Sequence, residues 1–415
     1  MMMTRVRVGF GVAALVLASC GNDGSVTSST STSGKVSTSS STTTAIATVP
    51  AGSTTMVPST TPAPTAGMLD PSFGKDGLTI VPLTVGGSAV PALAGAVAVD
   101  ADGRIVVAGE ADVAGQPHVA LTRLLSNGSP DESFGERGSL ILDQPGDANG
   151  LLPLNGGGMV ITGISLDSNS GSAQLLLARL LEDGSPDVTF GTDGRTTVGC
   201  DVGQCSPTPP VRQSGGRIVI VATDVINEQP FEGTIAVFGF DGEGRLDPSF
   251  GSGGIARLGA GSASTVALDA SERVLIVGAV SDSNFIARLS PDGALDTSFG
   301  TNGISTFPQV QETESWNAAV VTTGDRVVVA GGRGEGDFSD EITLTRFDDR
   351  GRLDTGYGTA GIVGIALNAM SYPAAIVTDQ LDRTTVAGVS DGQFFVTRID
   401  QHGRLDTNFG SQGIT

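Results

Sequence analysis

The chain carries little positive charge. Of its 415 residues, 23 are Lys or Arg and 44 are Asp or Glu, which gives a formal net charge of −21 at pH 7. Lys35 and Lys75 are the only lysines. This balance argues against a basic surface that binds nucleic acid or anionic lipid headgroups by electrostatic attraction. It is compatible with cationic partners, with uncharged glycans, or with acidity that only keeps a surface protein soluble.

Histidine and cysteine are also scarce. His118 and His402 stand at no recognised spacing from a nucleophile, and no serine-hydrolase, zinc-protease, P-loop or dinucleotide motif occurs in a suitable context. The sequence therefore predicts no catalytic residue, no metal site and no cofactor. Cys200 and Cys205 lie close together before a proline-rich stretch, and we expect them to form a local disulfide in an oxidising compartment.

Long hydrophobic runs are absent except near the beginning of the chain. Arg5 and Arg7 precede an apolar stretch from Val8 to Leu17, which is too short to span a bilayer comfortably. It ends in Leu17-Ala18-Ser19-Cys20-Gly21, which resembles a bacterial lipobox. The resemblance implies a signal peptide at residues 1–19, lipidation of Cys20 and an extracytoplasmic protein that is lipid-anchored to the bacterial cell membrane. An ordinary signal peptide with a chance cysteine is the alternative.

Residues 20–67 lack the apolar content that a folded core needs. The runs Ser28–Ser33 and Ser37–Thr44 consist only of Ser and Thr, and prolines follow at Pro58, Pro62 and Pro64. Such a composition cannot bury enough apolar surface to offset the entropy of ordering. We expect a disordered linker between the lipid anchor and a folded body that spans residues 68–415.

The body contains one nine-residue motif seven times. The copies begin at Leu69, Pro130, Pro186, Leu246, Leu295, Leu353 and Leu405; three of them read LDxSFGxxG and the others differ from it at one or two positions. Their aromatic residues stand 49 to 61 positions apart: Phe73, Phe134, Phe190, Phe250, Phe299, Tyr357 and Phe409. Self-similarity at this period predicts a repeat architecture.

Between the motifs the apolar pattern is that of short strands, with no convincing helical period. The first unit illustrates it, with expected strands at 78–83, 96–99, 105–109 and 119–125 and a turn at 100–103. Six such units predict an all-β fold, a six-bladed β-propeller of four-stranded blades, because radial repetition hides sheet edges. Only Ile414 and Thr415 follow the last motif, so we expect the strand 78–83 to complete the last blade and close the ring. An open β-solenoid is the alternative architecture.

The LDxSFGxxG signature at a period just under sixty resembles the delta-60 repeat family of bacterial β-propeller proteins. The resemblance covers residue 68 to the carboxyl terminus and implies an extracytoplasmic propeller, without implying any catalytic residue. The copies with Pro130, Pro186 and Gly356-Tyr357 depart mildly from the pattern.

The motif itself suits a corner between neighbouring sheets. Its Asp can accept local backbone N–H groups, and its aromatic ring can fill the wedge between two sheets. An Arg near the end of five strands is expected to pair with a motif Asp: Arg123, Arg179, Arg288, Arg346 and Arg398. Because the Asp recurs in every copy and the Arg in five units, we interpret them as architectural.

Ligand binding is more plausible at residues that occur in one unit alone. Trp316, the single tryptophan, follows Glu312 and Glu314, and a second acidic group contains Asp337, Asp340 and Glu341. An aromatic ring beside carboxylates can stack a sugar or hold a cation, although a buried Trp beneath a solvated loop is the alternative. We predict a non-catalytic binding or scaffold module for a protein or a cell-wall glycan. The alternative is a carbohydrate or lactone hydrolase or lyase with carboxylates at a central channel.

Overall fold

The computed structural model describes residues 67–166, 172–200, 205–228, 231–309, 315–334, 340–367 and 370–415. Within these ranges every regular element is a β-strand. None of the described residues forms a helix long and apolar enough to cross a membrane. The predicted signal peptide, Cys20 and almost all of the predicted linker lie outside the described residues.

The first two sheets share one long strand. β6 (Ser139–Pro153) pairs through its first half with β5 and through its second half with β7, so that one seven-stranded ladder turns from one sheet into the next. Sheet 1 contains β3 (Ala92–Val99), β4 (Ile105–Val113), β5 (Gln116–Leu124) and the first half of β6. Sheet 2 contains the second half of β6, β7 (Met159–Leu166), β8 (Ala173–Leu180) and β9 (Arg195–Gly199).

The next sheets repeat the same antiparallel order. Sheet 3 contains β10 (Cys205–Pro207), β11 (Val211–Arg212), β12 (Ile218–Glu228), β13 (Phe231–Phe240) and β14 (Ile255–Ala260). Sheet 4 contains β15 (Ser262–Leu268), β16 (Val274–Val280), β17 (Ser283–Leu289) and β18 (Ile304–Pro308). Sheet 5 contains β19 (Ser315–Thr322), β20 (Arg326–Arg333), β21 (Glu341–Phe347) and β22 (Ile362–Ala366).

Sheet 6 is completed by the end of the chain. It contains β23 (Ser371–Thr378), β24 (Thr384–Ser390) and β25 (Gln393–Ile399). Thr415 exchanges backbone hydrogen bonds with Val396, and Ile414 lies opposite Thr397, so residues 413–415 take the outer position. We predicted that residues 78–83 would take this place, and this prediction was wrong. The corner at 405–413 delivers the following residues directly beside β25, which leaves no room there for another strand.

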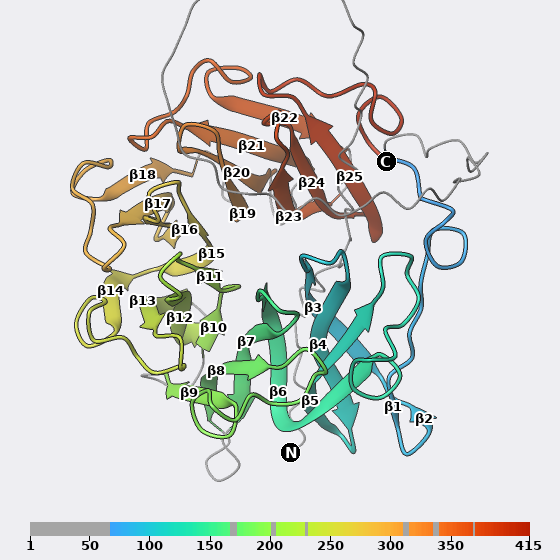
Figure 1. The fold of residues 1–415 in the computed structure, drawn as a ribbon. Coiled ribbons are helices and arrows are strands. Elements are labelled where there is room, and N and C mark those ends of the chain that lie inside the picture. Colours follow the sequence, from blue (N-terminus) through green and yellow to red (C-terminus); the bar gives the residue numbers. More distant parts are fainter. Residues whose placement is uncertain are drawn as a thin grey trace, which may run out of the picture. The chain divides into compact units, whose positions relative to one another are not determined.

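The residues before β3 form a short hairpin, β1 (Thr84–Val85) with β2 (Ser88–Ala89). In Figure 1 the sheets follow one another around the body, and residues 67–91 run between sheet 6 and sheet 1. The tight turns between strands form as expected. Asp100 Oδ1 accepts the N–H groups of Asp102 and Arg104 at 3.0 and 2.9 Å, and Gly103 adopts a positive φ of 76° that glycine tolerates.

The core is divided among the spaces between consecutive sheets. Each space holds a buried apolar cluster contributed by both neighbours, such as Val119 and Leu121 of sheet 1 against Ile161 and Leu176 of sheet 2. Corresponding clusters join sheets 2 and 3, 3 and 4, 4 and 5, and 5 and 6. Among the described residues no such cluster joins sheet 6 to sheet 1. The hydrophobic stabilisation of the body therefore comes from contacts between sequence neighbours.

Candidate functional site

The seven motif copies form corners at the rim of the sheets. We number them in chain order, corner 1 to corner 7: residues 69–77, 130–138, 186–194, 246–254, 295–303, 353–361 and 405–413. In corner 2, Asp131 Oδ1 accepts the hydroxyl of Ser133 at 2.6 Å and its backbone N–H at 3.1 Å. Both bonds recur in corners 1, 3, 4 and 5, and the backbone N–H bond alone recurs in corners 6 and 7, which confirms the predicted local turn.

An arginine connects each of corners 2 to 7 to the strand ladder. Arg123 Nε donates to Asp131 Oδ2 at 2.8 Å, and all five predicted Arg–Asp pairs are present with this spacing of eight residues. The Arg123 guanidinium also lies 4.6 Å from the centroid of the Phe134 ring, an arrangement that every corner with an arginine repeats. The prediction that these residues are architectural is supported by their contacts, since aspartate, arginine and ring satisfy one another.

The same arginines reach across to the following sheet. Arg123 Nη1 donates to the carbonyl of Glu182 in the turn after β8, and Arg288 Nη1 donates to the carbonyl of Asp349 after β21. Arg179, Arg217 and Arg346 make the corresponding bonds to the next sheet in their turn. Each of corners 2 to 6 is therefore a clamp between two sheets.

Sequence reasoning missed one of these arginines. In sheet 3 the usual position on the third strand is Gly239, and the guanidinium comes instead from Arg217 at the start of β12, with Nε 2.7 Å from Asp247 Oδ2. A Cβ at Gly239 would stand only 2.5 Å from Phe250 Cγ, so the ring occupies the space that a side chain would need. The sequence signal that could have pointed to Arg217 was the absence of an arginine at position 239, where the other five units have one.

Hydrogen bonds lower the pKa of the aspartates in corners 1 to 5 and so favour their charged form. The Ser249 hydroxyl and then the Ser249 N–H outweigh desolvation, and with Arg217 they lower the pKa of Asp247 to about 2. For Asp131 and Asp296 desolvation is the largest influence and opposes ionisation, but hydrogen bonds from the neighbouring serine and the arginine still lower the pKa. Low pKa values suit permanent ion pairs and do not suit general acids at neutral pH.

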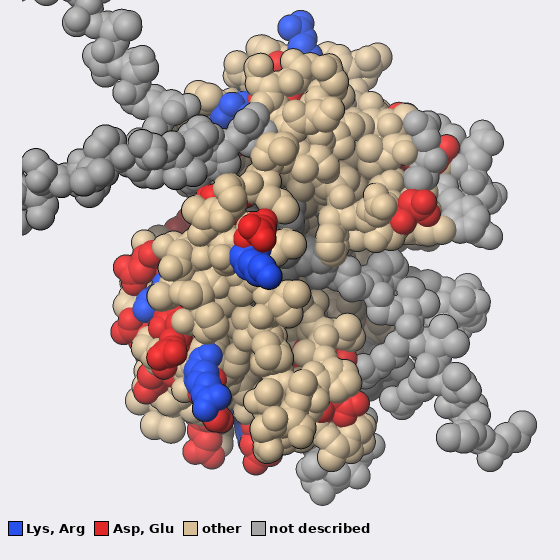
Figure 2. All heavy atoms as spheres, turned by 90° about the vertical axis from the view of Figure 1, so that its right-hand side faces the viewer, with Lys and Arg blue, Asp and Glu red and all other residues tan. Residues whose placement is uncertain are grey.

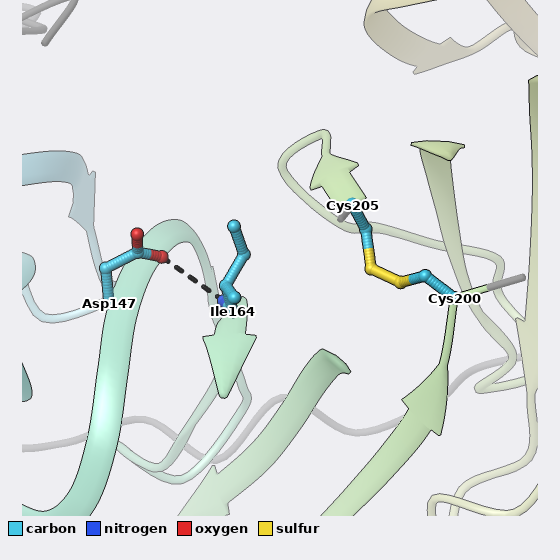
Figure 3. Close-up of a disulfide and its surroundings, with 4 residues drawn as sticks. All are labelled: Asp147, Ile164, Cys200 and Cys205. Atoms are coloured by element: carbon cyan, nitrogen blue, oxygen red, sulfur yellow. Dashed lines mark hydrogen bonds between the residues drawn. A yellow bond between two sulfur atoms is a disulfide. The ribbon is translucent and has the colours of Figure 1, made fainter. Parts of the chain in front are cut away.

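The predicted disulfide between Cys200 and Cys205 is present. Cys200 directly follows β9 of sheet 2, and Cys205 begins β10 of sheet 3, so the bond joins two sheets, as Figure 3 shows. In the same view Asp147 of β6 accepts the N–H of Ile164 at 3.2 Å across the neighbouring ladder. The disulfide is therefore a structural link between sheets.

The predicted ligand residues fall into three groups. Trp316 lies on β19 with 5% of its surface exposed, packed against Phe307 and Phe347 with ring centroids 5.6 and 5.3 Å away. Glu312, Glu314 and Asp337 lie outside the described residues. Ligand binding at Trp316 stays a prediction, and its buried indole offers little surface for stacking a sugar.

The remaining two acidic residues stand at one end of sheet 5. Asp340 is exposed and uses its carbonyl to accept the N–H of Leu367 at 3.2 Å. Glu341 begins β21 and pairs with Arg333 of β20 at 2.5 Å. Ser315, the neighbour of Trp316, lies opposite Gly332, so the structure does bring the tryptophan and Glu341 to the same end of sheet 5.

Corner residues line two hollows of the surface. One hollow of about 220 Å³ includes Arg217 and Asp247 of corner 4, and another of about 660 Å³ includes Asp131 and Arg137 of corner 2. Among the described residues no group of three or more His, Cys, Asp or Glu side chains is placed to hold a metal ion. The hollows thus lie beside the Arg–Asp pairs of corners 4 and 2.

The most unusual surface lies between sheet 6 and sheet 1, and we call it the seam. In the third strand of every sheet, one residue that faces the next sheet stands four positions before the corner arginine. In sheet 3 the count starts from Gly239, which takes the place of that arginine. The residue that faces the next sheet is buried in the first five sheets: Val119, Leu175, Ile235, Asn284 and Ile342. In sheet 6 the corresponding residue is Phe394, with 67% of its surface exposed.

The opposite wall of the seam is also incompletely covered. Val107 on β4 faces backward from sheet 1 and is only half-buried, whereas its equivalents in sheets 2 to 6 are fully buried: Ile161, Ile220, Ile276, Val329 and Val386. Val99 beside it and Val377 on β23 are exposed. Figure 2 views the body from this side; uncharged residues surround one acidic and one basic side chain near the middle of the face, and carboxylates gather toward its lower left. Apolar side chains that elsewhere form the core thus reach the surface here.

The chain shares its repeat with a known family. Residues 101–134, 157–190 and 273–299 match the model of DUF5122, described as a domain of unknown function that forms a beta-propeller. Each matched segment ends at the aromatic residue of a corner: Phe134, Phe190 and Phe299. No curated protein matches the sequence.

Several solved structures resemble the chain at low identity. Sqt1 from Chaetomium thermophilum is 13% identical, with 75% of this chain and 71% of that chain covered and a TM-score of 0.43. A protein of unknown function from Dyadobacter fermentans is 14% identical, with 76% and 93% covered and a TM-score of 0.38. The β-propeller domain of the Trilobed protease from Pyrococcus furiosus is 9% identical, with 75% and 81% covered and a TM-score of 0.41.

Proposed function

We propose, from the premise that the chain carries DUF5122 β-propeller repeats, that it is an extracytoplasmic lipoprotein whose propeller binds another protein. The lipobox-like run before Cys20 supports lipidation, and the composition of residues 20–67 supports a flexible linker from the membrane to the body. The seven corners support membership of the delta-60 repeat proteins.

Sheets 1 to 6 are, in this proposal, six four-stranded blades. The clamp from each corner to the following sheet supports this assignment, as does the division of the core into clusters between consecutive sheets. The pairing of residues 413–415 with β25 supports a last blade completed by the carboxyl terminus.

The seam is the observation that carries the binding function. Monomeric soluble proteins rarely expose contiguous apolar patches of more than a few hundred Å², and larger patches mark interaction sites. The charged groups that recur in the sheets are used within corners, whereas Phe394, Val377 and Val99 are left exposed. A protein partner suits such a surface better than a glycan. The hydrolase or lyase alternative gains no supporting observation among the described residues.

A binding assay on the full chain tests this function. The Cys20→Ser variant, which removes the lipidation site, is titrated with proteins extracted from the bacterial envelope and, separately, with purified peptidoglycan. We expect Phe394→Ser to weaken protein binding about tenfold, since burial of one phenylalanine contributes roughly 1.5–3 kcal/mol. Val188→Ser, which alters an equally exposed residue of corner 3, is the matched control and should change nothing. Peptidoglycan binding that is indifferent to Phe394 would contradict the proposal.

The anchor has its own test. In bacteria given a radiolabelled fatty acid, the wild-type protein should carry label and sediment with the membrane fraction, and Cys20→Ser should lose both properties. Membrane retention of an unlabelled Cys20→Ser protein would contradict lipid anchoring.

A further inference from the structure

The body has one more corner than it has sheets. Corner 1 contacts sheet 1 in the same way that corner 2 contacts sheet 2 and corner 3 contacts sheet 3. Gly74 donates its N–H to the carbonyl of Asn127 at 2.7 Å, and Thr79 Oγ1 donates to the carbonyl of Gly128 at 2.8 Å. Corner 3 makes the same two bonds to sheet 3, from Gly191 to Glu243 and from Thr196 to Gly244. Corner 1 therefore occupies the position of an outer corner for which no sheet is described.

The other side of the seam repeats this arrangement. Thr415 Oγ1, which follows corner 7, donates to the carbonyl of Gly67 at 2.7 Å. Gly67 stands two residues before corner 1, as Gly128 stands two residues before corner 2. Residues 67–77 thus lie between corner 7 and sheet 1 with the contacts of an additional sector. The three inner strands of that sector are missing from the described residues.

The segment after corner 1 has the features of an unpaired outer strand. In the other sectors the residues after the corner pair with the third strand, as Thr196 pairs with Leu177. Residues 79–82 form no backbone hydrogen bond within the described part of the chain. Their side chains nevertheless alternate between half-buried and exposed, and Ile80 has 92% of its surface exposed. An open edge of this kind is a template for pairing with another strand.

The chain's own preceding residues do not suit the missing third strand. In every complete sheet this strand ends four residues before the turn glycine, for example at Leu124 before Gly128. The equivalent positions before Gly67 are residues 57–63, which include Pro58 and Pro62. Proline has no N–H to donate to a ladder and is essentially confined to edge strands, whereas a third strand pairs on both sides.

A second copy of the chain is also a poor occupant. Its described strands are already paired, so the segment that a second copy could offer is residues 79–82, which is the acceptor edge itself. Each copy carries a formal charge of −21, and association of two copies would be opposed by repulsion. Between residues 67 and 113 the only basic residues are Lys75 and Arg104, against six carboxylates. The charge favours a cationic partner.

We propose that the seam is a strand-acceptor site, at which a different protein adds an extended apolar segment with basic flanking residues to residues 78–83. The proposal rests on the binding function above and specifies its partner. Main-chain hydrogen bonds to residues 79–82 fix the register of the partner's strand. Alternate apolar side chains of that strand pack against Phe394 on one wall of the seam and against Val107 on the other. The basic flanks meet the surrounding carboxylates.

A synthetic hairpin tests the proposal directly. The probe copies residues 274–289, the second and third strands of sheet 4, with two lysines added at each end and a fluorophore. A second probe has the same sequence but is N-methylated at the β17 residues that would donate to the acceptor strand. Fluorescence anisotropy is measured on the full chain carrying Cys20→Ser, on its Ile80→Asp and Phe394→Asp variants, and on Val188→Asp as the matched control.

We expect saturable binding of the first probe, a loss of about tenfold or more on N-methylation, and a similar loss in the two seam variants but not in Val188→Asp. Equal binding of both probes would overturn strand addition, yet it would leave the seam as an apolar binding surface. Failure of both probes to bind would also overturn the proposal. In that case, a dimer in sedimentation that Ile80→Asp dissociates would assign the seam to a second copy. Thermal melts of each variant check that these exposed substitutions leave the fold intact.

Discussion

Arg123 is the most completely buried cation among the described residues, and replacing it with methionine probes the corner clamp. Its side chain is fully buried and Asp131 is almost so, with 2.8 Å between Nε and Oδ2. Arg123→Met keeps the apolar stem but leaves the Asp131 carboxylate without its cation and the Glu182 carbonyl without its donor. Removing one partner of a buried pair costs about 3–5 kcal/mol. Because Ser133 still donates to Asp131, we expect a loss of about 3 kcal/mol.

Urea unfolding monitored by circular dichroism measures this loss. Arg352→Met is the matched control, because Arg352 pairs with Asp348 at the same 2.8 Å but is 67% exposed. A surface pair of this kind contributes about 0–1 kcal/mol. The loss in free energy of unfolding for Arg288→Met should lie between those of Arg123→Met and Arg352→Met. Arg273 Nη1 remains 3.6 Å from Asp296 Oδ2, so this carboxylate keeps a cation nearby. Equal destabilisation by Arg123→Met and Arg352→Met would refute the reasoning that burial decides the strength of the clamp.

Three further changes test other parts of the structure. Gly239→Ala should destabilise the body by about 1–3 kcal/mol in urea melts, because the new Cβ would overlap Phe250; Gly242→Ala, with nothing within 4 Å of the new atom, should have no comparable effect. Because the pKa of Asp247 is lowered from 3.8 to about 2 in the folded chain, its carboxylate contributes stability above pH 3.8, and this contribution should be lost as the pH falls toward 2. The melting temperature should therefore fall steeply in acid. Asp247→Asn should have a lower melting temperature than the wild type at pH 7, and its melting temperature should fall less in acid. A fall as large as that of the wild type would contradict the assignment. Replacing Cys200 and Cys205 together with serine should cost about 2 kcal/mol, the chain-entropy value for so short a loop, and a variant as stable as the wild type would show that the disulfide does not brace sheets 2 and 3.

The corners could be predicted from the sequence because their chemistry is local. Asp131 and Ser133 stand two residues apart, and Arg123 stands eight residues before Asp131, so one repeat contains both partners. Repetition of the same letters then indicated that the contacts belong to the architecture. The disulfide was predictable for the same reason, since only four residues separate its cysteines.

The remaining features depend on contacts between distant segments. The role of Arg217 follows from Gly239, but only the packing of Phe250 explains why no side chain fits there. The placement of residues 413–415 beside β25 could not be inferred from the length of the chain after corner 7, because two or three residues suffice for that pairing. Burial of Trp316 was likewise undecided in the sequence, since Phe307 and Phe347 reach it from different strands.

The clamp from each corner to the following sheet has a consequence for how the body comes apart. Each of sheets 2 to 5 is held by the sheet before it and the sheet after it, as in a row of repeats whose stability is a sum of nearest-neighbour terms. Sheet 6 and sheet 1 have an apolar cluster on one side only, so they are the two ends of this row. Opening should begin there and move inward, and amide hydrogens of β3 and β25 should exchange with solvent sooner than those of β16 in the middle.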